Sequence, residues 1–182
     1  SATYFLAAAA VTQGRVAITN LSDESFQGDL KFLDILSEMG CTVVHHEERI
    51  ELRGGKLFGI EVDMNELPDC VPTLAVIAAF AKGQTTISNV GQLRYKETDR
   101  LNALSAELIK LGVGVEVFED SLTIHPQPLS GATISTYNDH RMAMSFAVAG
   151  LSIPGIRIEN PACVSKSFPT FWDEFTKLEG QK

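Results

Sequence analysis

Three stretches of the chain are small and apolar along their whole length, and each ends at or near a glycine. They cover residues 1–13, 70–82 and 140–152, and all three are rich in alanine. A segment that is apolar on every side suits a helix buried in the interior, and alanine is a strong helix former. The sequence therefore predicts three buried helices, each ending where a residue can turn left-handed at little cost.

Each apolar stretch is followed by the same short pattern of glycine, alternating strand and asparagine. The glycines are Gly14, Gly83 and Gly155, and the strands lead to Asn20, Asn89 and Asn160. A second helix is predicted after each strand, over 27–40, 96–112 and 171–178. Two strands follow the first two of these helices, over 41–45 and 49–52 and then over 113–118 and 121–125. The pattern predicts a unit of helix, strand, helix, strand, strand that occurs three times.

The three units organise the chain as a single domain, residues 1–182. We place them at approximately 1–68, 69–138 and 139–182, and the third is incomplete because no strands follow its second helix. The chain begins without a methionine and in the middle of a predicted helix, which suggests a piece of a longer polypeptide. We expect strands from elsewhere in such a parent chain to complete the array.

Charged residues gather at 93–100, ahead of a helix with one apolar face. The apolar face carries Leu101, Leu104, Leu108 and Leu111. The charged stretch holds three cations, Arg94, Lys96 and Arg100, and two carboxylates. Backbone N–H groups at a helix start favour an anion, and arginine or lysine beside them suits a phosphate. Mutually paired surface charges explain the same residues, so the pattern alone leaves both interpretations open.

The third buried helix begins with a second charged cluster. Asp139 is predicted to cap this helix, which leaves His140 and Arg141 in its first turn. Cations in that turn oppose the helix dipole by roughly 0.3–1 kcal/mol each, and an anion in front of the helix would offset this effect. Pairing of Arg141 with a surface carboxylate, together with simple packing of His140, explains the same residues.

Two further residues take equivalent places in the repeat. Asp69 precedes the second buried helix as Asp139 precedes the third, and helix capping is the simpler explanation for it. Lys166 precedes the last helix, in the loop that Lys96 occupies in the second unit. The array thus offers six cations at corresponding helix starts, which we expect to face one anion-binding cleft: Arg94, Lys96, Arg100, His140, Arg141 and Lys166.

Composition narrows the class of ligand. The net charge of −8 argues against general binding of nucleic acid or of an anionic membrane surface, so an anion site would be a local exception. The apolar start of the chain lacks a basic leader and is too short to span a bilayer. Cys41, Cys70 and Cys163 have neither paired nor metal-ligand spacing, which favours a reducing compartment and argues against a zinc site.

Five motifs together resemble the 5-enolpyruvylshikimate-3-phosphate synthase family, in the same order and at compatible spacing. They are SFQGD, DMNELPD, LRYKETDRL, TYNDHRMAM and KSFP, and they cover essentially the whole chain. The resemblance implies the C-terminal domain of that family. Its fold is an α/β one, an inside-out α/β barrel of three βαβαββ units, and it is one of two domains that close around the substrates. In the family, the opening segment of the full chain returns to complete this domain.

The resemblance also implies a reaction. The family transfers the enolpyruvyl group of phosphoenolpyruvate to the 5-hydroxyl of shikimate-3-phosphate and releases phosphate, without a metal or organic cofactor. By motif position, the implied catalytic residues are Glu97, which shuttles protons at phosphoenolpyruvate, and Asp69, which holds or deprotonates the 5-hydroxyl. The implied phosphoenolpyruvate contacts are Arg100, His140, Arg141 and Lys166. The implied shikimate-3-phosphate contacts are Asp69, Lys96 and Gln92, where the family often has asparagine.

Because the other domain of the family supplies the rest of the site, we expect this chain alone to be inactive as a synthase. The expected location is the cytoplasm, or the plastid if the source is a plant. An enolpyruvyl transferase acting on UDP-N-acetylglucosamine is an alternative, although its arginine and cysteine signatures are not visible. RNA 3′-terminal phosphate cyclase has related units, but the acidic balance disfavours it. A non-catalytic anion-binding module of the same fold is a third alternative, against which the two carboxylates Asp69 and Glu97 argue.

Overall fold

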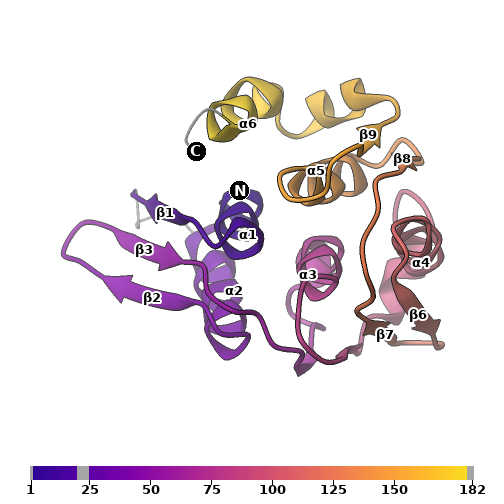
Figure 1. The fold of residues 1–182 in the computed structure, drawn as a ribbon, viewed down its shortest axis with the longest axis horizontal. Coiled ribbons are helices and arrows are strands. Elements are labelled where there is room, and N and C mark those ends of the chain that lie inside the picture. Colours follow the sequence, from indigo (N-terminus) through magenta and orange to yellow (C-terminus); the bar gives the residue numbers. More distant parts are fainter. Residues whose placement is uncertain (1, 20–24, 180–182) are drawn as a thin grey trace.

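The computed structural model describes residues 2–19 and 25–179, and its elements follow the predicted units (Figure 1). The first unit contains α1 (Thr3–Thr12), β1 (Arg15–Ile18), α2 (Ser25–Glu38), β2 (Thr42–His45) and β3 (Ile50–Arg53). The second contains α3 (Val71–Ala78), β5 (Thr85–Ser88), α4 (Arg100–Lys110), β6 (Gly114–Val117) and β7 (Leu122–His125). The third contains α5 (His140–Gly150), β9 (Arg157–Ile158) and α6 (Phe171–Glu179). Asn20 and Gly180, which border predicted elements, lie outside the described residues.

Five short elements were not predicted. They are the strands β4 (Glu61–Asp63) and β8 (Thr133–Ile134) and the 3-10 helices η1 (Pro68–Cys70), η2 (Gly91–Tyr95) and η3 (Pro161–Lys166). Strands of two or three residues are too short to show an alternating pattern. With β4, the second unit has the order β4-α3-β5-α4-β6-β7, which is the expected βαβαββ arrangement. The expected boundaries at 69 and 139 fall after β4 and β8, and we propose that the units begin with these strands.

The three sheets follow one plan. The second sheet has the strand order β4-β5-β7-β6, in which β4 is parallel to β5 and β7 is antiparallel to both of its neighbours. The first sheet has the order β1-β3-β2 with the same antiparallel pairing, so it matches the β5-β7-β6 part. The third consists of the parallel pair β8 and β9, which matches the β4-β5 part. The repeat in the sequence is therefore also a repeat of strand pairing.

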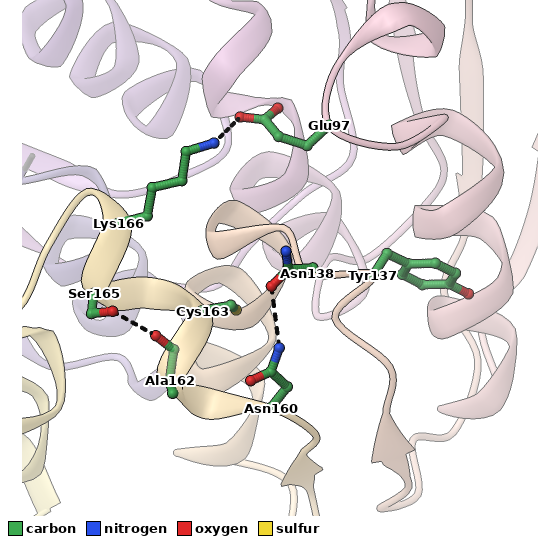
Figure 2. Close-up of a pocket in the computed structure, with 8 residues that line it drawn as sticks. All are labelled: Glu97, Tyr137, Asn138, Asn160, Ala162, Cys163, Ser165 and Lys166. Atoms are coloured by element: carbon green, nitrogen blue, oxygen red, sulfur yellow. Dashed lines mark hydrogen bonds and ion pairs between the residues drawn. The ribbon is translucent and has the colours of Figure 1, made fainter.

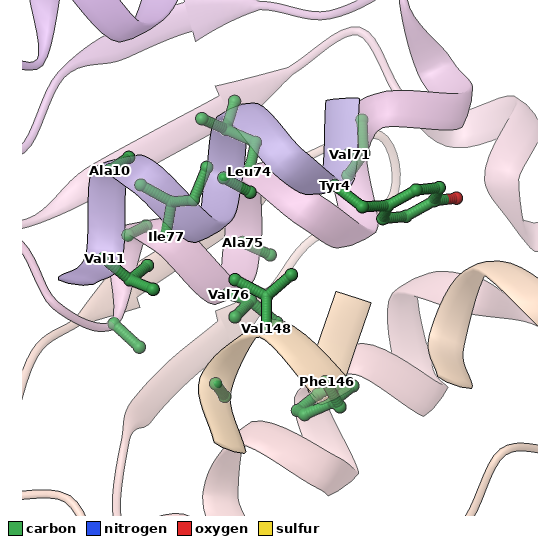
Figure 3. Packing of buried hydrophobic residues seen from close by; sticks show 14 of the residues in the cluster. Tyr4, Ala10, Val11, Val71, Leu74, Ala75, Val76, Ile77, Phe146 and Val148 are labelled. Atoms are coloured by element: carbon green, nitrogen blue, oxygen red, sulfur yellow. The ribbon is translucent and has the colours of Figure 1, made fainter. Parts of the chain in front are cut away.

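The three alanine-rich helices α1, α3 and α5 pack against one another in the middle of the molecule (Figure 1). Every residue of α3 is buried, and Ala7 and Ala10 of α1 are fully covered. Val11, Ile77 and Val148, one from each helix, belong to the same hydrophobic cluster (Figure 3). The sheets and the outer helices α2, α4 and α6 lie around these three helices (Figure 1). This arrangement confirms the expected α/β fold with buried central helices.

Left-handed residues mark both ends of the short strands. Gly83 and Gly155 have φ values of 90° and 85°, but they lie beyond the ends of α3 and α5, whose C-caps Ala79 and Leu151 are right-handed. In the first unit α1 ends near Gly14 as predicted, and the left-handed residue is its C-cap Gln13, with φ 55°. Asn89 and Asn160 are also left-handed, with φ 57° and 47°. Asparagine tolerates this conformation, so the glycine–strand–asparagine pattern reflects two backbone requirements.

Candidate active site

The guanidinium of Arg100 lies at the centre of a cluster of charged residues. Arg100 opens α4 and is only 1% exposed. Its Nε donates to Asp139 Oδ2 at 2.6 Å and its Nη2 to Glu97 Oε2 at 2.7 Å. Its Nη1 donates to Asp69 Oδ1 at 3.2 Å. Since these carboxylates precede α5, α4 and α3 respectively, one buried cation connects the starts of three helices.

Helix α4 begins at Arg100, later than the predicted start at Lys96. Asp99 explains the difference, because its Oδ1 accepts a hydrogen bond from the backbone N–H of Asn102 at 3.1 Å and so caps the helix. Lys96 has an extended backbone, and Glu97 follows it in the loop between η2 and α4. The two residues therefore belong to a loop in front of the helix. The predicted apolar face of α4 is confirmed, and all four of its leucines are buried.

The two predicted helix caps have different outcomes. Asp139 caps α5 as predicted, and its Oδ1 accepts from the backbone N–H of Arg141 at 2.9 Å. The prediction that Asp69 caps α3 is wrong, because Cys70 occupies the N-cap position. Asp69 lies within η1, which adds a turn ahead of α3, and its carboxylate accepts from Arg141 Nη2 at 2.8 Å as well as from Arg100. Its partners are therefore side chains, Arg100 from the same unit and Arg141 from the third unit.

Two lysines stand at the edge of the cluster. The Nζ of Lys96 lies 3.9 Å from Asp69 Oδ1, and the Nζ of Lys166 lies 3.8 Å from Glu97 Oε1 (Figure 2). Both distances are those of loose ion pairs, and the lysine side chains are 35% and 67% exposed. Each ammonium group can therefore turn to an anionic ligand without a large loss of protein contacts.

Arg94 does not join the cluster, contrary to the expectation that six cations face one cleft. Its guanidinium donates to the backbone carbonyls of Phe118 and Glu119 at 2.6 and 2.9 Å and to the carboxylate of Asp99 at 3.1 Å. Arg94 thus fixes the turn between β6 and β7 beside η2. Gln92 lies in η2 and is half-buried.

Protein carboxylates balance most of the remaining cations. Lys96, Arg100, Arg141 and Lys166 all form ion pairs with Asp69, Glu97 or Asp139. Charge balance in the cluster therefore does not depend on a bound anion. An anion that binds here exchanges places with a protein carboxylate, and that carboxylate is then free to act on the ligand.

Two hollows flank the cluster. The larger has a volume of about 550 Å³, and Figure 2 shows the side chains that line it. It is lined by Glu97, Tyr137, Asn138, Asn160, Ala162, Cys163, Ser165 and Lys166. The smaller, of about 310 Å³, is lined by Tyr4, His140, Arg141, Met144, Ser167 and Phe168. Groups of the cluster thus face two neighbouring spaces, one polar and one partly aromatic.

Local electrostatics set the charge state of the cluster. A hydrogen bond from its own backbone N–H and the charge of Arg100 lower the pKa of Glu97, so this carboxyl is ionised at neutral pH. Burial and the charge of Arg141 lower the pKa of His140, and its Nδ1 has no hydrogen-bond partner among the described residues. Burial lowers the pKa of Arg100, but the hydrogen bond and charge of Asp139 outweigh this effect, so the pKa is raised overall. The cluster therefore combines permanent cations, ionised carboxylate and a neutral imidazole.

The sequence did not predict Tyr4 as a neighbour of the site. Burial raises the pKa of its phenol to about 12, against the lowering effect of the nearby Arg141 charge. Tyr4 is the second residue of α1, just as Arg141 is the second residue of α5. The repeat therefore places Tyr4 and Arg141 at equivalent positions, which could have indicated Tyr4 as a neighbour of the site. Cys163, which lines the larger hollow, was also missed, and burial raises the pKa of its thiol. Both groups are protonated at neutral pH.

The described residues contain no group of three or more histidine, cysteine or acidic side chains arranged to hold a metal ion. In the same part of the chain, no helix has both the length and the apolar character needed to cross a membrane. The cluster itself offers cations that suit carboxylate or phosphate groups and carboxylates that suit proton transfer. Its chemistry fits a substrate with more than one anionic group.

Solved structures with a similar fold include an EPSP synthase and another enolpyruvyl transferase. The structure of EPSP synthase from Acinetobacter baumannii has a TM-score of 0.86 and 29% identity, over 97% of this chain and 44% of that one. The enolpyruvyl transferase from Streptomyces tendae has a TM-score of 0.78, over 97% of this chain and 41% of that one. Its identity of 20% shows the fold alone. The architecture is therefore that of an enolpyruvyl transferase domain.

The sequence then defines the family. Residues 1–175 match EPSP synthase (3-phosphoshikimate 1-carboxyvinyltransferase), and the chain belongs to this family. The 3-phosphoshikimate 1-carboxyvinyltransferase of Nostoc punctiforme is 50% identical, over 98% of this chain and 42% of that protein. That of Methanoculleus marisnigri is 51% identical, over 95% of this chain and 41% of that protein. The resemblance carried by the five motifs is confirmed, and the chain spans less than half the length of these relatives.

Proposed function

We propose that this chain forms one part of a 3-phosphoshikimate 1-carboxyvinyltransferase. The reaction joins phosphoenolpyruvate to the 5-hydroxyl of shikimate-3-phosphate and releases phosphate. The observation that carries the proposal is the cluster in which Arg100 binds Asp69, Glu97 and Asp139 while Arg141 shares Asp69. Both proposed substrates carry several negative charges, and arginine binds carboxylate and phosphate through two parallel hydrogen bonds.

Phosphoenolpyruvate is proposed to bind between the helix starts. Arg100, Arg141 and Lys166 supply its cationic contacts, and His140 lies beside Arg141 at the start of α5. Shikimate-3-phosphate is proposed to contact Asp69, Gln92 and Lys96, and Lys96 is already within 3.9 Å of Asp69. Each substrate anion replaces a protein carboxylate as the partner of a cation, so binding and the release of Asp69 and Glu97 occur together.

Glu97 and Asp69 are proposed to carry the proton transfers. Asp69 takes the proton of the 5-hydroxyl as the hydroxyl oxygen bonds to the central carbon of phosphoenolpyruvate. At the same time, the methylene carbon gains a proton from Glu97. The methyl group of the resulting tetrahedral intermediate returns a proton to the Glu97 carboxylate as phosphate leaves, which restores the carbon–carbon double bond. Glu97 is ionised in the free protein, so it must first accept a proton. An anion that draws Arg100 and Lys166 away from Glu97 raises its pKa and favours that step.

The rest of the active site is proposed to come from a second domain. The chain spans 42% of the Nostoc punctiforme protein. The larger hollow beside Glu97 and Lys166 is open, so these groups face a space that another domain can close (Figure 2). A closed site excludes water and strengthens the electrostatic contacts to the substrates. We therefore expect the chain alone to release no phosphate. The free thiols Cys41, Cys70 and Cys163 are consistent with a cytoplasmic location.

A chimera tests the proposal. This chain replaces the matching part of the Nostoc punctiforme protein, and phosphate release from the two substrates is compared with that of the chain alone. The chimera is expected to turn over and the chain alone to be inactive. Glu97→Gln should lower kcat of the chimera by about 100-fold or more, because the side chain can no longer transfer a proton.

Glu66→Gln is the matched control, because Glu66 is 73% exposed and pairs with Lys31 outside the cluster. Its kcat should equal that of the unmutated chimera. A folded chimera that binds both substrates without turnover contradicts the transferase proposal and favours a module that only binds anions. Equal activity of Glu97→Gln and the control contradicts the role given to Glu97.

A further inference from the structure

Glu107 is a fully buried carboxylate of α4 that lies outside the charged cluster. Its Oε1 accepts from the hydroxyl of Tyr137 at 2.8 Å, and its Oε2 accepts from the backbone N–H of Ser135 at 3.0 Å. Lys110 donates to both oxygens, at 2.9 and 2.7 Å. Each of these partners is a donor, so the buried charge is fully compensated. The proposed reaction gives Glu107 no role.

The segment that Glu107 holds leads directly into the charged cluster. Tyr137 and Asn138 both have φ 55°, a left-handed conformation that asparagine tolerates but that is unfavourable for tyrosine. Asp139, which pairs with Arg100 and caps α5, follows immediately. A strained residue such as Tyr137 persists only where the surrounding contacts fix it. Two other contacts hold this turn: the backbone N–H of Asp139 donates to the carbonyl of Thr136 at 2.8 Å, and Asn160 Nδ2 donates to Asn138 Oδ1 at 3.2 Å on an exposed edge (Figure 2).

Helix α4 binds this segment at both ends. Arg100 and Glu107 are seven residues apart, which places them on the same face of the helix, two turns from each other. Arg100 holds Asp139 at one end of the segment, and Glu107 holds Ser135 and Tyr137 at the other. The ring of Tyr137 points away from Lys166 in Figure 2, and its hydroxyl donates to Glu107 of α4. Burial and Glu107 raise the pKa of this phenol to about 12, so it remains a donor.

We propose that Glu107 is a positioning residue for the proposed reaction, acting through Tyr137. The hydrogen bond between them holds the left-handed turn at 137–138, and this turn sets the places of Asp139 and Arg141 at the start of α5. The inference rests on the proposed function, because Arg141 is assigned there to phosphoenolpyruvate. Loss of the hydrogen bond between Glu107 and Tyr137 is expected to weaken the binding of phosphoenolpyruvate while the fold is retained.

Two variants of the chimera separate this role from a general loss of stability. Tyr137→Phe removes only the hydroxyl and leaves Lys110 on both oxygens of Glu107, so the buried carboxylate stays paired. Glu107→Gln places an amide NH₂ against groups that are themselves hydrogen-bond donors. The hydrogen bonds that one of the two carboxylate oxygens accepted are therefore lost. Glu51→Gln is the matched control, because Glu51 is also buried and accepts from Arg53, but it lies in β3 of the first sheet.

The expected result is a change in KM. Tyr137→Phe should raise KM for phosphoenolpyruvate about tenfold with kcat changed less, as is typical when one hydrogen bond to a charged group is lost. The double variant with Glu107→Gln should be no worse than the more severe single variant, because both remove the same contact. Glu51→Gln should leave KM unchanged. A role in stability alone would reduce the amount of active protein and lower the apparent kcat at constant KM, and that result would overturn the proposal.

Hydrogen exchange at the Arg141 amide decides the proposal independently of turnover. This N–H donates to Asp139 Oδ1, so it reports directly on the start of α5. Tyr137→Phe should speed its exchange about tenfold, while amides of the first sheet keep their rates. Unchanged exchange at Arg141 contradicts the positioning role whatever the activity. If the unmutated chimera folds but is inactive, the proposed function fails, and the exchange rates still show whether Glu107 and Tyr137 hold the turn.

Discussion

Arg100 and Asp139 form a buried ion pair that joins the starts of α4 and α5. Nε lies 2.6 Å from Oδ2 and Nη2 lies 3.3 Å from Oδ1, with the two side chains 1% and 0% exposed. Removing two charges from water is unfavourable, and only their mutual contact offsets that loss. The pair therefore links residues that are far apart in the sequence, and it makes the geometry of the cluster depend on both partners.

The first prediction concerns this pair. Asp139→Asn keeps the size of the side chain and a capping oxygen, but it leaves the guanidinium of Arg100 without its closest negative charge. We expect the free energy of unfolding to fall by about 3–5 kcal/mol, the usual effect of breaking a buried ion pair. Urea unfolding of the chain, followed by circular dichroism, measures it. Asp34→Asn on the exposed side of α2 is the control, and an equal loss in both variants would contradict the prediction.

The second prediction concerns the shape of the cation at Arg141. Its Nη2 donates to Asp69 Oδ2 at 2.8 Å, and Arg141 lines the same hollow as Tyr4. Arg141→Lys keeps the charge but loses the planar fork that binds a carboxylate or phosphate through two bonds. In the chimera we expect KM for phosphoenolpyruvate to rise about tenfold or more. Arg157→Lys on exposed β9 should have no effect, and the same KM in both variants would be evidence against this role.

The third prediction concerns the contact between the first sheet and α1. Gly54 follows β3, and a Cβ atom there would lie 2.1 Å from the carbonyl oxygen of Ala9 and 2.7 Å from Cα of Gln13. Both are backbone atoms, so Gly54→Ala should destabilise the chain by about 1–3 kcal/mol through overpacking.

Gly28→Ala is the comparison for this third prediction. Gly28 lies inside α2, and the nearest atom to an added Cβ is Leu67 Cδ2 at an ordinary 3.7 Å. Alanine is the better helix former, so this variant should gain about 0.5–1 kcal/mol. Opposite signs in urea unfolding confirm the packing argument, and a stable Gly54→Ala protein refutes it.

Local rules made much of the fold predictable from the sequence. The spacing of Leu101 and Leu104 gave the buried face of α4, and Asp139 stood where a cap was required. These features depend on helix period and on groups a few residues apart. The repeat extended the same reasoning to three units, and the five motifs were sufficient to place the chain in its family.

The choice of partners among charged residues could not be predicted in the same way. Asp69 looked like a cap and proved to bind Arg141, whereas Arg94 looked like a ligand contact and proved to bind carbonyl groups of a nearby turn. Which cation meets which carboxylate depends on how α1, α3 and α5 pack, because residues from different units meet there. Tyr137 and Glu107 were missed for the same reason, since 30 residues separate them in the sequence.

The last prediction concerns the pH dependence of stability. A hydrogen bond from its own backbone N–H and the charge of Arg100 lower the pKa of Glu97 in the folded chain below the ordinary value of 4.5. The unfolded chain therefore binds this proton more readily than the folded chain does. The stabilising contribution of ionised Glu97 is fully present above pH 4.5 and is lost as the pH falls through the lower, folded pKa.

Glu97→Gln removes this titration, so the free energy of unfolding should depend less steeply on pH below 4.5 than it does in the unmutated chain. Urea unfolding at a series of pH values measures the two slopes. Glu66→Gln, at a side chain that is 73% exposed, should leave the slope unchanged. Because the shift arises from contacts to Glu97 inside the cluster, identical slopes for Glu97→Gln and the unmutated chain would show that those contacts do not form in solution. The proposed exchange of Glu97 for a substrate anion would then lose its physical basis.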